Sequence, residues 1–420
     1  MDIKLTAFPA ENGESILVEI YGSEKVNILI DLGYSATYKK YIKRKLSMLS
    51  QGGQKIDLLI ITHFDRDHVE GGIEFFNDLL KDKFIDIGEI WINDFLALSS
   101  QKFDLKNINS TQELIYDFSN FLVKEYRNNS EENKQTISVG ESITLTKLIN
   151  KLGFDEIVNK SLKNKIVCFD EENDDKSIYL NNEVKLKILS PKNHTLKLLL
   201  FNFLKWFEKD RNIYSSVDKK ELFELFISNL DDNIKDFANE VLLKVKTSSA
   251  SEHNDIIESI LKNKDVFKDG RLINNSSIAF LLSFNGINIM FPGDLDCKNI
   301  IDIVKDERLD LLKVPHHGSR NNINIDFINS VHCNNYLICT DGSGSSKHPD
   351  LETLVYIAQK GESNVYVNYP ISEFIIDYDV IDLLKKKYNI NLATASGDEN
   401  TCFELILKKG EMILCQEVNF

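Results

Sequence analysis

A short segment dense in metal-binding side chains limits the possible fold most. Residues 61–72 read ITHFDRDHVEGG; the apolar run KIDLLI precedes them, and apolar residues at helical spacing follow in EGGIEFFNDLLKD. A short apolar run is typical of a buried strand, and apolar residues three and four apart are typical of a helix. The segment therefore lies where a strand ends and a helix begins, at the edge of a layered α/β sheet where ligands bind.

The spacing within this segment predicts a metal site. His63, Asp65, Asp67 and His68 stand two, two and one residues apart, and two glycines follow at 71 and 72. Imidazole suits zinc, iron and manganese, carboxylates favour harder ions, and glycine allows close approach of backbone. A solvated charged loop is the simpler interpretation of the segment taken alone.

Three further segments carry the same residue types after predicted strands. FPGDLD contains Asp294, LKVPHHGSRNN contains His316 and His317, and SSKHPD contains His348, so five of the eight histidines lie in such loops. Carboxyl ends of neighbouring strands share one edge of a sheet, and we expect these loops to meet there. For the three other histidines we predict surface positions (His194, His253 and His332).

Strands and helices alternate along the rest of the chain. Strands are predicted at 5–8, 15–21, 26–33, 55–63, 87–94, 184–191, 309–319 and 335–342, with hairpins at 276–294 and 402–418. Helices are predicted at 34–49, 70–82, 110–127, 142–153, 297–306 and 352–361. A block at about 194–265 is apolar at helical spacing throughout, and we interpret it as a helical insertion or lid, with plain packing against the main body as the alternative.

Composition excludes several classes of protein. The 420 residues carry a formal net charge of −15, which disfavours sequence-independent coating of nucleic acid, since phosphate binding needs a basic surface. The six cysteines form no CxxC pair, so neither a zinc knuckle nor a disulfide framework is indicated. We find no secretory signal and no apolar stretch of membrane-spanning length, and we predict a cytoplasmic protein with no membrane partner.

The order DLG, HxDxDHxxGG, GDLD, HHGS and HP resembles the metallo-β-lactamase superfamily. More narrowly, it is similar to the metallo-hydrolase domain of ComEC-like competence (DNA-uptake) proteins. The matching motifs cover about 1–92, 184–192 and 274–349. The resemblance implies an α/β fold, an αββα sandwich of two mixed sheets flanked by helices. Residues 1–192 would form its first half, 193–270 a helical insertion or lid, and 271–420 its second half.

The resemblance also implies roles for the motif residues. His63 and Asp65 would serve one ion, Asp67 and His68 the other, and Asp294 would bridge the two ions. Asp31 would orient a ligand histidine. Either His316 or His317 would complete the second ion site, and His317 is favoured. His348 would bind a substrate phosphate or donate a proton to the leaving group.

Two departures from the superfamily pattern affect the first ion. Asp65 stands where the common first motif has a second histidine, which shifts preference from zinc toward manganese or magnesium. No histidine lies between His68 and His194 to act as the usual third-motif ligand. Asn93 or Asp94 could substitute, although a structural capping role is the stronger interpretation of both. We predict one or two divalent ions, manganese or zinc, with magnesium as an alternative.

These features together predict a metal-dependent hydrolase of phosphodiesters, with nucleic acid as the first substrate candidate. Asp67 would accept the proton of the attacking water. The rival predictions are hydrolysis of a small molecule (nucleotide, cyclic dinucleotide, lactone or thioester) and a weakly active sensor or partner subunit. The 194–265 block could bind a protein partner or a second copy. The candidate phosphate contacts are Ser319, Arg320, Lys313 and Lys347.

Overall fold

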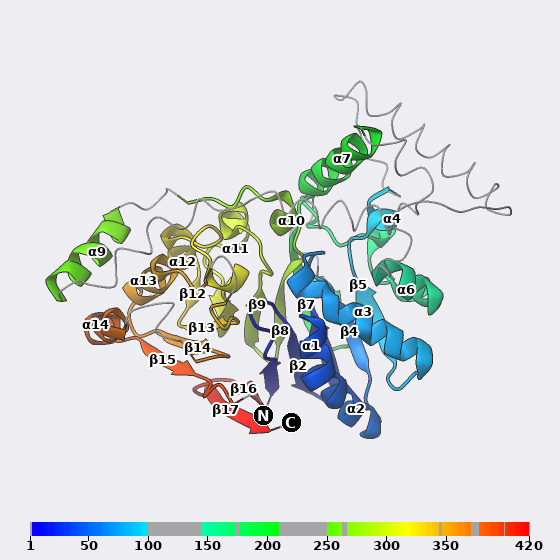
Figure 1. Cartoon of the computed structure of the whole chain (residues 1–420), viewed down its shortest axis with the longest axis horizontal. Helices are drawn as coiled ribbons and strands as arrows, with labels where there is room; N and C mark the ends of the chain where they lie inside the picture. The colour runs from blue at the N-terminus through cyan, green and yellow to red at the C-terminus, as the bar shows by residue number, and fades with distance from the viewer. Residues whose placement is uncertain are drawn as a thin grey trace.

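Two mixed β-sheets pack face to face in the computed structural model, and helices cover the outer face of each sheet (Figure 1). Helices α2, α3 and α6 lie on one side, and α12, α13 and α14 on the other. The predicted αββα sandwich is thereby confirmed. The structure describes residues 2–99, 145–172, 177–209, 250–262, 267–343, 347–370, 378–398 and 400–419.

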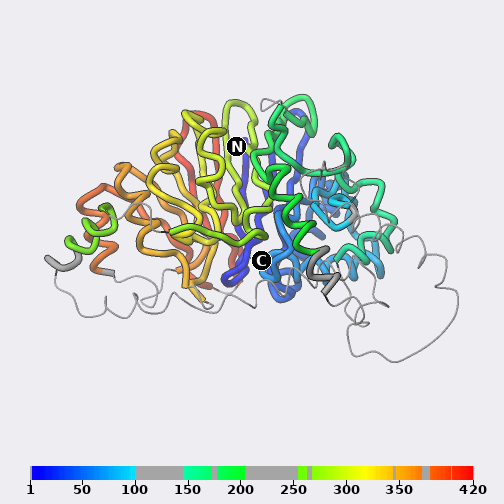
Figure 2. The backbone as a smooth tube through the Cα atoms, turned by 90° about the horizontal axis from the view of Figure 1, so that it is seen from above, coloured from blue at the N-terminus to red at the C-terminus, as the bar shows by residue number. Residues whose placement is uncertain are grey.

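The first sheet has seven strands in the order β17-β16-β1-β2-β3-β4-β5. β1 pairs antiparallel with both β2 and β16, so strands from the two ends of the sequence lie together in the middle of the molecule (Figure 2). β3, β4 and β5 run parallel. The bounds are Ile3–Ala7, Ile16–Tyr21, Lys25–Ile30, Ile56–Ile60 and Ile87–Trp91 for β1–β5, then Thr401–Leu407 and Leu414–Asn419 for β16 and β17.

The second sheet has eight strands in the order β15-β14-β13-β11-β9-β8-β7-β6. Neighbouring strands are parallel in one part of this sheet, which consists of β15, β14, β13, β11 and β9. Neighbours are antiparallel in the other part, which consists of β9, β8, β7 and β6. The bounds are Ser177–Tyr179, Lys185–Ser190, Ala279–Phe284, Ile287–Phe291, Leu311–Lys313, Asn335–Ile338, Asn364–Val367 and Asn391–Thr394; the short β10 (Arg308–Leu309) and β12 (His332–Cys333) pair separately.

Alternating side chains divide the core into three layers. In β2, Val18 packs between the sheets whereas its neighbour Leu17 packs against the helices. In β9, Ile289 packs between the sheets and Met290 against the other helical layer. Successive side chains of a strand point to opposite faces, so strands apolar on both faces must lie in the centre of a layered fold.

The helices that cover the first sheet begin with α1 (Ser35–Thr37), the π-helical turn η1 (Tyr38–Ile42) and α2 (Lys43–Gln51), which continue one another. They correspond to the predicted helix at 34–49. The predicted helix at 142–153 is α6, and the one at 110–127 lies outside the described residues. The others on this side are α3 (Arg66–Lys81), α4 (Phe95–Ser99), α6 (Leu145–Lys151), η3 (Phe154–Ile157) and η4 (Lys163–Lys165).

Over the second sheet, the predicted helix at 297–306 is split into η6 (Cys297–Ile300) and α11 (Ile301–Val304), and the one at 352–361 is α13 (Leu351–Gln359). The strand predicted at 309–319 is wrong in length, because β11 ends at Lys313 and the two histidines follow in the 3-10 turn η7. Elements at 364–394 were missed. The remaining helices are α10 (Leu272–Asn275), η7 (His316–Gly318), α12 (Ile325–Ser330) and α14 (Tyr378–Tyr388).

The predicted helical block is described at its two ends, by α7 (Asn193–Lys209) and α9 (Ala250–Lys262). They join different layers: Phe203 of α7 packs on Phe95, with ring centroids 5.3 Å apart, and Ile257 of α9 is buried in the core beside the second sheet. Residues 210–249 lie outside the described residues. Where the structure describes the chain, no helix is both long and apolar enough to cross a membrane.

Candidate metal centre

The first group of candidate ligands follows β4, where the chain turns directly into α3. α3 begins at Arg66, four residues earlier than the predicted helix, so Asp67 and His68 lie in its first turn. Gly71 explains part of the motif: a Cβ there would lie 2.2 Å from the Leu32 carbonyl oxygen, and its N–H donates to the Gly33 oxygen at 2.7 Å. A glycine is therefore required for α3 to pack on the loop that follows β3.

The second group comes from three loops of the other sheet. Asp294 follows β9, the His316–His317 pair follows β11, and His348 lies beyond the end of β13. Both paired histidines have left-handed backbone, with φ of 45° at His316 and 55° at His317. Non-glycine residues rarely adopt that conformation, and strained backbone of this kind concentrates at functional sites.

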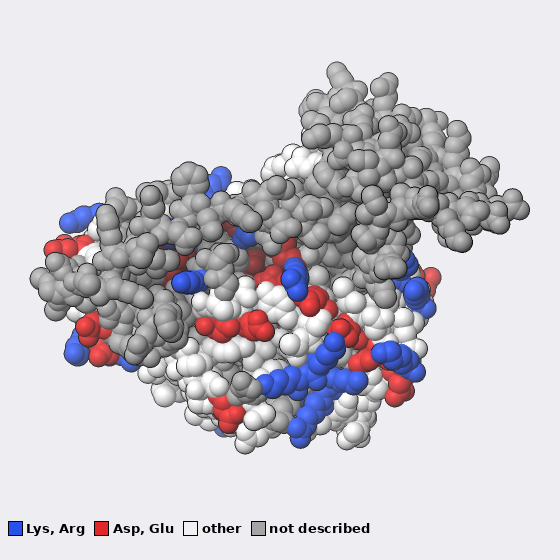
Figure 3. Space-filling view, in the orientation of Figure 1, with Lys and Arg blue, Asp and Glu red and all other residues white. Residues whose placement is uncertain are grey.

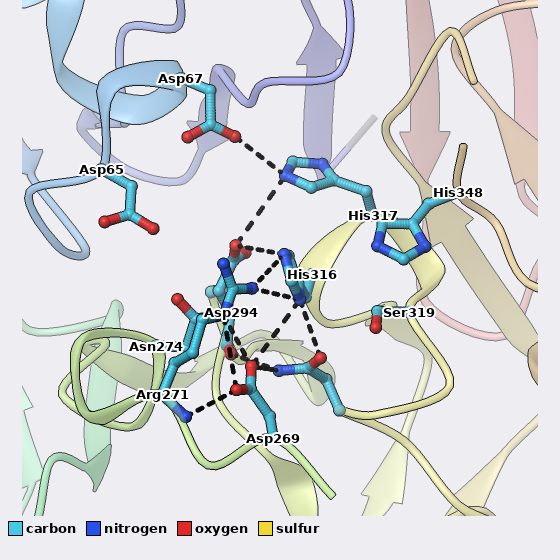
Figure 4. Close-up of polar contacts among 12 residues, drawn as sticks. Asp65, Asp67, Asp269, Arg271, Asn274, Asp294, His316, His317, Ser319 and His348 are labelled. Atoms are coloured by element: carbon cyan, nitrogen blue, oxygen red, sulfur yellow. Dashed lines mark hydrogen bonds and ion pairs between the residues drawn. The ribbon is translucent and has the colours of Figure 1, made fainter. Parts of the chain in front are cut away.

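These loops meet at one point (Figure 4). Ligand atoms of His63, His68 and Asp294 lie within 4.8 Å of one another, and so do those of Asp67, His68 and His317. Asp294 belongs to the first group and lies near the second: its Oδ2 is 3.8 Å from His63 Nε2, 3.6 Å from His68 Nε2 and 3.9 Å from His317 Nε2. The structure thus brings together residues 231 positions apart in the sequence (294 − 63).

A surrounding layer of polar groups orients each imidazole. Asp31 Oδ2 lies 2.7 Å from His68 Nδ1, and Asp31 also accepts from the backbone N–H and hydroxyl of Thr62. His317 Nδ1 donates to the carbonyl oxygen of Cys339 at 2.8 Å. His63 Nδ1 lies 3.0 Å from the Thr62 hydroxyl. In all three rings Nδ1 is engaged, and Nε2 is left to face the cluster.

The facing atoms lack hydrogen-bond partners although they are buried. Nε2 of His63, His68 and His317 and one oxygen each of Asp65 and Asp294 have none. Asp65 occupies the N-cap of α3, yet its side chain does not cap the helix and lies 3.5 Å from His63 Nε2. Burying unpartnered polar atoms is costly, and histidine–carboxylate sets of this kind are the usual ligands of divalent ions. The residues therefore fit a divalent metal ion.

The electrostatics of the cluster agree with that interpretation. Burial alone would raise the pKa of Asp294, but the imidazoles of His316, His68 and His317 hold it well below its usual range. Burial alone would lower the pKa of His68, but the carboxylates of Asp67, Asp294 and Asp31 raise it well above its usual value. In the absence of an ion, protonated imidazoles stabilise these carboxylates. A bound divalent cation would supply that positive charge instead.

His316 has surroundings different from those of His317. Its Nε2 lies 3.6 Å from Asp294 Oδ2, its Nδ1 lies 2.8 Å from Asn322 Oδ1, and the Arg271 guanidinium lies 2.8 Å from Nε2. The structure therefore places both paired histidines beside Asp294, while only His317 shares a group of candidate ligands with Asp67 and His68.

His348 lies across from the cluster, with its ring centroid 5.2 Å from that of His316 (Figure 4). Asp350 Oδ2 lies 3.3 Å from its Nδ1, and although burial would raise the pKa of Asp350, its contact with His348 lowers it.

Of the three histidines predicted at the surface, His194 and His332 are exposed, and the side chain of His253 lies outside the described residues.

Two of the four predicted phosphate contacts do not fit that role. Lys313 is fully buried and paired with Glu14, because its strand lies in the middle of the second sheet. Ser319 is also fully buried. Arg320 is paired with Glu352 at 2.7 Å and stacks on Phe267, and Lys347 is exposed in the loop that carries His348.

Asn93 and Asp94 have structural hydrogen bonds, in agreement with the capping interpretation. Asn93 exchanges two hydrogen bonds with the backbone of Val167, and Asp94 accepts from the backbone N–H of Ala97 in α4. Neither belongs to a group of candidate ligands among the described residues. The substitution predicted for the missing third-motif histidine is therefore not supported.

Several polar residues around the candidate ligands were not predicted from the sequence. Thr62 lies inside the motif itself, and Asp350 lies within the quoted HPD segment, so adjacency to a ligand was a usable signal for both. Asn322 ends the quoted LKVPHHGSRNN segment, so the same signal applied to it. Asp269 and Arg271 come from a segment with no motif, and only the folded structure brings them to His316.

The comparisons agree with the geometry. Residues 9–78 match the family model of the Metallo-beta-lactamase superfamily, a stretch that contains Asp31 and the whole loop from His63 to His68. The two-sheet sandwich places that stretch at the metal centre. Over residues 9–78 the chain is similar to that superfamily, and the whole chain forms an αββα sandwich of two mixed sheets.

A solved structure with the metallo-β-lactamase fold also aligns with the chain. It is the "metallo-beta-lactamase fold protein YhfI from Bacillus subtilis", at 8% sequence identity and a TM-score of 0.35, over 96% of this chain and 100% of that chain. At this TM-score the alignment carries no argument about fold or function. No curated protein matches the chain.

Proposed function

We propose that this protein is a divalent-metal-dependent hydrolase of phosphodiesters. The observation that supports it most is the convergence of buried Nε2 atoms and carboxylate oxygens, without hydrogen-bond partners, on Asp294. The motif order resembles that of the ComEC-like subgroup, which supports a nucleic acid or nucleotide substrate. A carboxylate-rich site also suits manganese or magnesium and an anionic transition state.

Asp67, His68, His317 and Asp294 would hold the metal ion, with His63 and Asp65 as further donors near it. A bound divalent ion activates a water and neutralises negative charge that develops on the reacting group. We assign the chemistry around it to the chain's own residues, beginning with the group that contacts water.

Asp67 would orient the attacking water and accept its proton. Its side chain is 20% exposed, whereas those of His68 and Asp294 are 0% and 2% exposed, so it is the most exposed of these ligands. Although burial would raise the pKa of Asp67, His68 and His317 hold it below its usual range, so the carboxylate stays ionised. Ionised carboxylates accept hydrogen bonds from water.

His348 would contact the leaving group. Asp350 Oδ2 lies 3.3 Å from its Nδ1, so a carboxylate would stabilise the charged ring and leave the other ring nitrogen to donate a proton or to bind a substrate phosphate. Lys347, exposed in the same loop, would add positive charge on the substrate side.

A second candidate function is hydrolysis of a small molecule, such as a nucleotide, cyclic dinucleotide, lactone or thioester. The net charge of −15 favours it over a nucleic-acid substrate. In Figure 3 a group of Lys and Arg side chains lies over α1 and α2. Within this group, Lys39 is paired with Glu74 and Lys43 with Asp78, which reduces the charge available to phosphates.

An activity screen with added manganese tests the proposal. The substrates are bis-(4-nitrophenyl) phosphate, a cyclic dinucleotide, single- and double-stranded DNA, RNA, a lactone and a thioester. Turnover of the phosphodiesters, absent in Asp294→Ala, would support it, and turnover of the lactone or thioester alone would favour the second candidate. Manganese binding without turnover of any substrate would contradict hydrolysis and favour a sensor or partner subunit.

A further inference from the structure

A buried ion pair joins the two sheets beside the candidate ligands. Lys313, the last residue of β11 in the second sheet, pairs through Nζ with the carboxylate of Glu14, which lies just before β2 in the first sheet. Their side chains are 0% and 1% exposed. Burial would lower the pKa of Lys313, but Glu14 and Asp294 raise it, so the lysine stays charged. The interior therefore holds two opposite charges, although removing charges from water is costly.

The Glu14 end of this pair supports the turn of α3 that carries Asp67. The backbone N–H of Glu14 donates to the Asp67 carbonyl oxygen at 3.2 Å, and a Cβ at Gly13 would clash with the same oxygen. The next residue, Ser15, donates from its hydroxyl to the carbonyl oxygen of Asp31 at 3.0 Å. The turn before β2 thus lies against the backbone of both aspartates.

The Lys313 end supports the loop that carries Asp294. Lys313 Nζ lies 3.5 Å from the carbonyl oxygen of Gly293, the residue before Asp294. The same oxygen accepts from the backbone N–H of His316 at 3.1 Å. The ammonium group therefore contacts backbone at the place where the loops that follow β9 and β11 meet.

Fold stability alone does not explain an ion pair at this position. The layer between the sheets is apolar around Lys313: Leu311 lies on the same face of β11, and Leu337 lies opposite on β13. Replacing a buried ion pair with apolar side chains of similar volume is often neutral or stabilising. What this pair adds is a link between two pieces of backbone that carry ligands from different sheets.

We propose that Glu14 and Lys313 are a positioning pair for the metal centre: they fix Asp67 relative to Asp294, so that ligands from the two sheets face one ion. The pair acts through the backbone of Asp67 and Gly293. The inference rests on the metal centre of the proposed function and is independent of the substrate. It also gives Lys313, which the sequence predicted as a phosphate contact, a role that agrees with its burial.

Calorimetric titration with Mn²⁺ alone tests the inference. In Glu14→Leu/Lys313→Met, apolar side chains of similar size replace both charges, so we expect a melting temperature close to that of the wild type. The dissociation constant for manganese should rise about 10- to 100-fold, the size of effect typical of groups that support metal ligands. Glu14→Gln/Lys313→Met, which keeps the shape of Glu14, should behave in the same way.

Glu19→Leu/Lys45→Met is the matched control. Glu19 and Lys45 are also a buried pair, with oxygen and nitrogen 2.9 Å apart and side chains 8% and 9% exposed. Neither belongs to a group of candidate ligands in the part of the chain that the structure describes. Removal of this pair should leave the manganese dissociation constant unchanged.

Three results would overturn the inference and leave the proposed function standing. The first is a wild-type dissociation constant in both double variants of the Glu14–Lys313 pair. The second is loss of the fold in both, because the pair would then serve stability instead. The third is an equal loss of affinity in the control. A wild-type chain that binds no manganese would overturn the proposed metal centre as well.

Discussion

Two buried clusters of charge in this molecule have opposite designs. Around Glu19, one carboxylate oxygen lies 2.8 Å from Lys4 Nζ and 2.9 Å from Lys45 Nζ, and Lys4 also reaches Glu404 at 3.5 Å. Around Asp294, Oδ2 lies 3.6–3.9 Å from Nε2 of His63, His68 and His317, too far for a hydrogen bond, and none of these three nitrogens has another hydrogen-bond partner. The first cluster balances its charges internally, and the second leaves its lone pairs directed at a common centre.

The difference separates a structural cluster from a binding one. Glu19 joins β2 to β1 and α2 through its two lysines, and needs nothing from outside the chain. The Asp294 cluster has its outer nitrogens fixed by Asp31 and Cys339, which is an arrangement that favours a ligand at the inner nitrogens. Burial alone does not distinguish these cases; the partners of the buried atoms do.

Removal of Asp294 should have the largest effect. Asp294→Ala deletes the carboxylate that lies within 4 Å of His63, His68, His316 and His317, so we expect hydrolysis of bis-(4-nitrophenyl) phosphate to fall to the background rate and tight manganese binding to be lost. Asp302→Ala, an exposed aspartate on α11, is the control and should leave both unchanged. A variant that folds and cleaves like the wild type would show that the cluster is not the site.

Removal of the metal should abolish activity reversibly. EDTA followed by dialysis should stop turnover, and added manganese should restore it better than calcium, because imidazole-containing sites favour transition ions over calcium. The initial rate of phosphodiester cleavage measures both steps. A rate that does not respond to the chelator would contradict a metal mechanism.

An intermediate effect is expected at Asp31, which contacts the site through His68. Asp31→Asn weakens the hold on His68 Nδ1, so manganese affinity should fall by about 10- to 100-fold while the fold is kept. Calorimetric titration measures the dissociation constant. An unchanged affinity would mean that Asp31 only caps its turn.

A substitution in the Glu19 cluster should have the smallest effect on function. We expect Glu19→Gln to keep the activity and the manganese affinity of the wild type. Glu19→Gln leaves the buried Lys45 without its counter-charge and Lys4 with Glu404 alone, which costs about 3–5 kcal/mol in the free energy of unfolding. Burial would raise the pKa of Glu19, but Lys45 and Lys4 lower it. Its contribution is therefore complete above the unfolded-state pKa of about 4.3 and is lost as pH falls through the folded-state pKa.

Urea unfolding at several pH values measures this contribution. The difference in stability between wild type and Glu19→Gln should be constant near neutral pH and should shrink below about pH 4, since the wild-type carboxylate then gains a proton. A Glu19→Gln variant that is fully folded but no longer binds manganese would contradict the distinction between the two clusters.

The sequence predicted the ligands better than their surroundings. His63 to His68 lie within one motif, and Asp294 and His317 each follow a recognisable apolar strand, so local patterns were sufficient. Lys313 was misassigned because strand register decides whether a lysine at a strand end is exposed, and register is set by pairing across the sheet. Arg271 was missed because its position depends on Asp269 and Asn274, which no periodic pattern marks.

The central claim is that Asp67, His68 and His317, grouped beside Asp294, bind a divalent ion. A crystal structure of the manganese-soaked protein, with anomalous differences collected for manganese, tests it most directly. We predict one strong anomalous peak within bonding distance of His68 Nε2 and His317 Nε2. A map with no peak there, or with its strongest peak away from these residues, would contradict the claim.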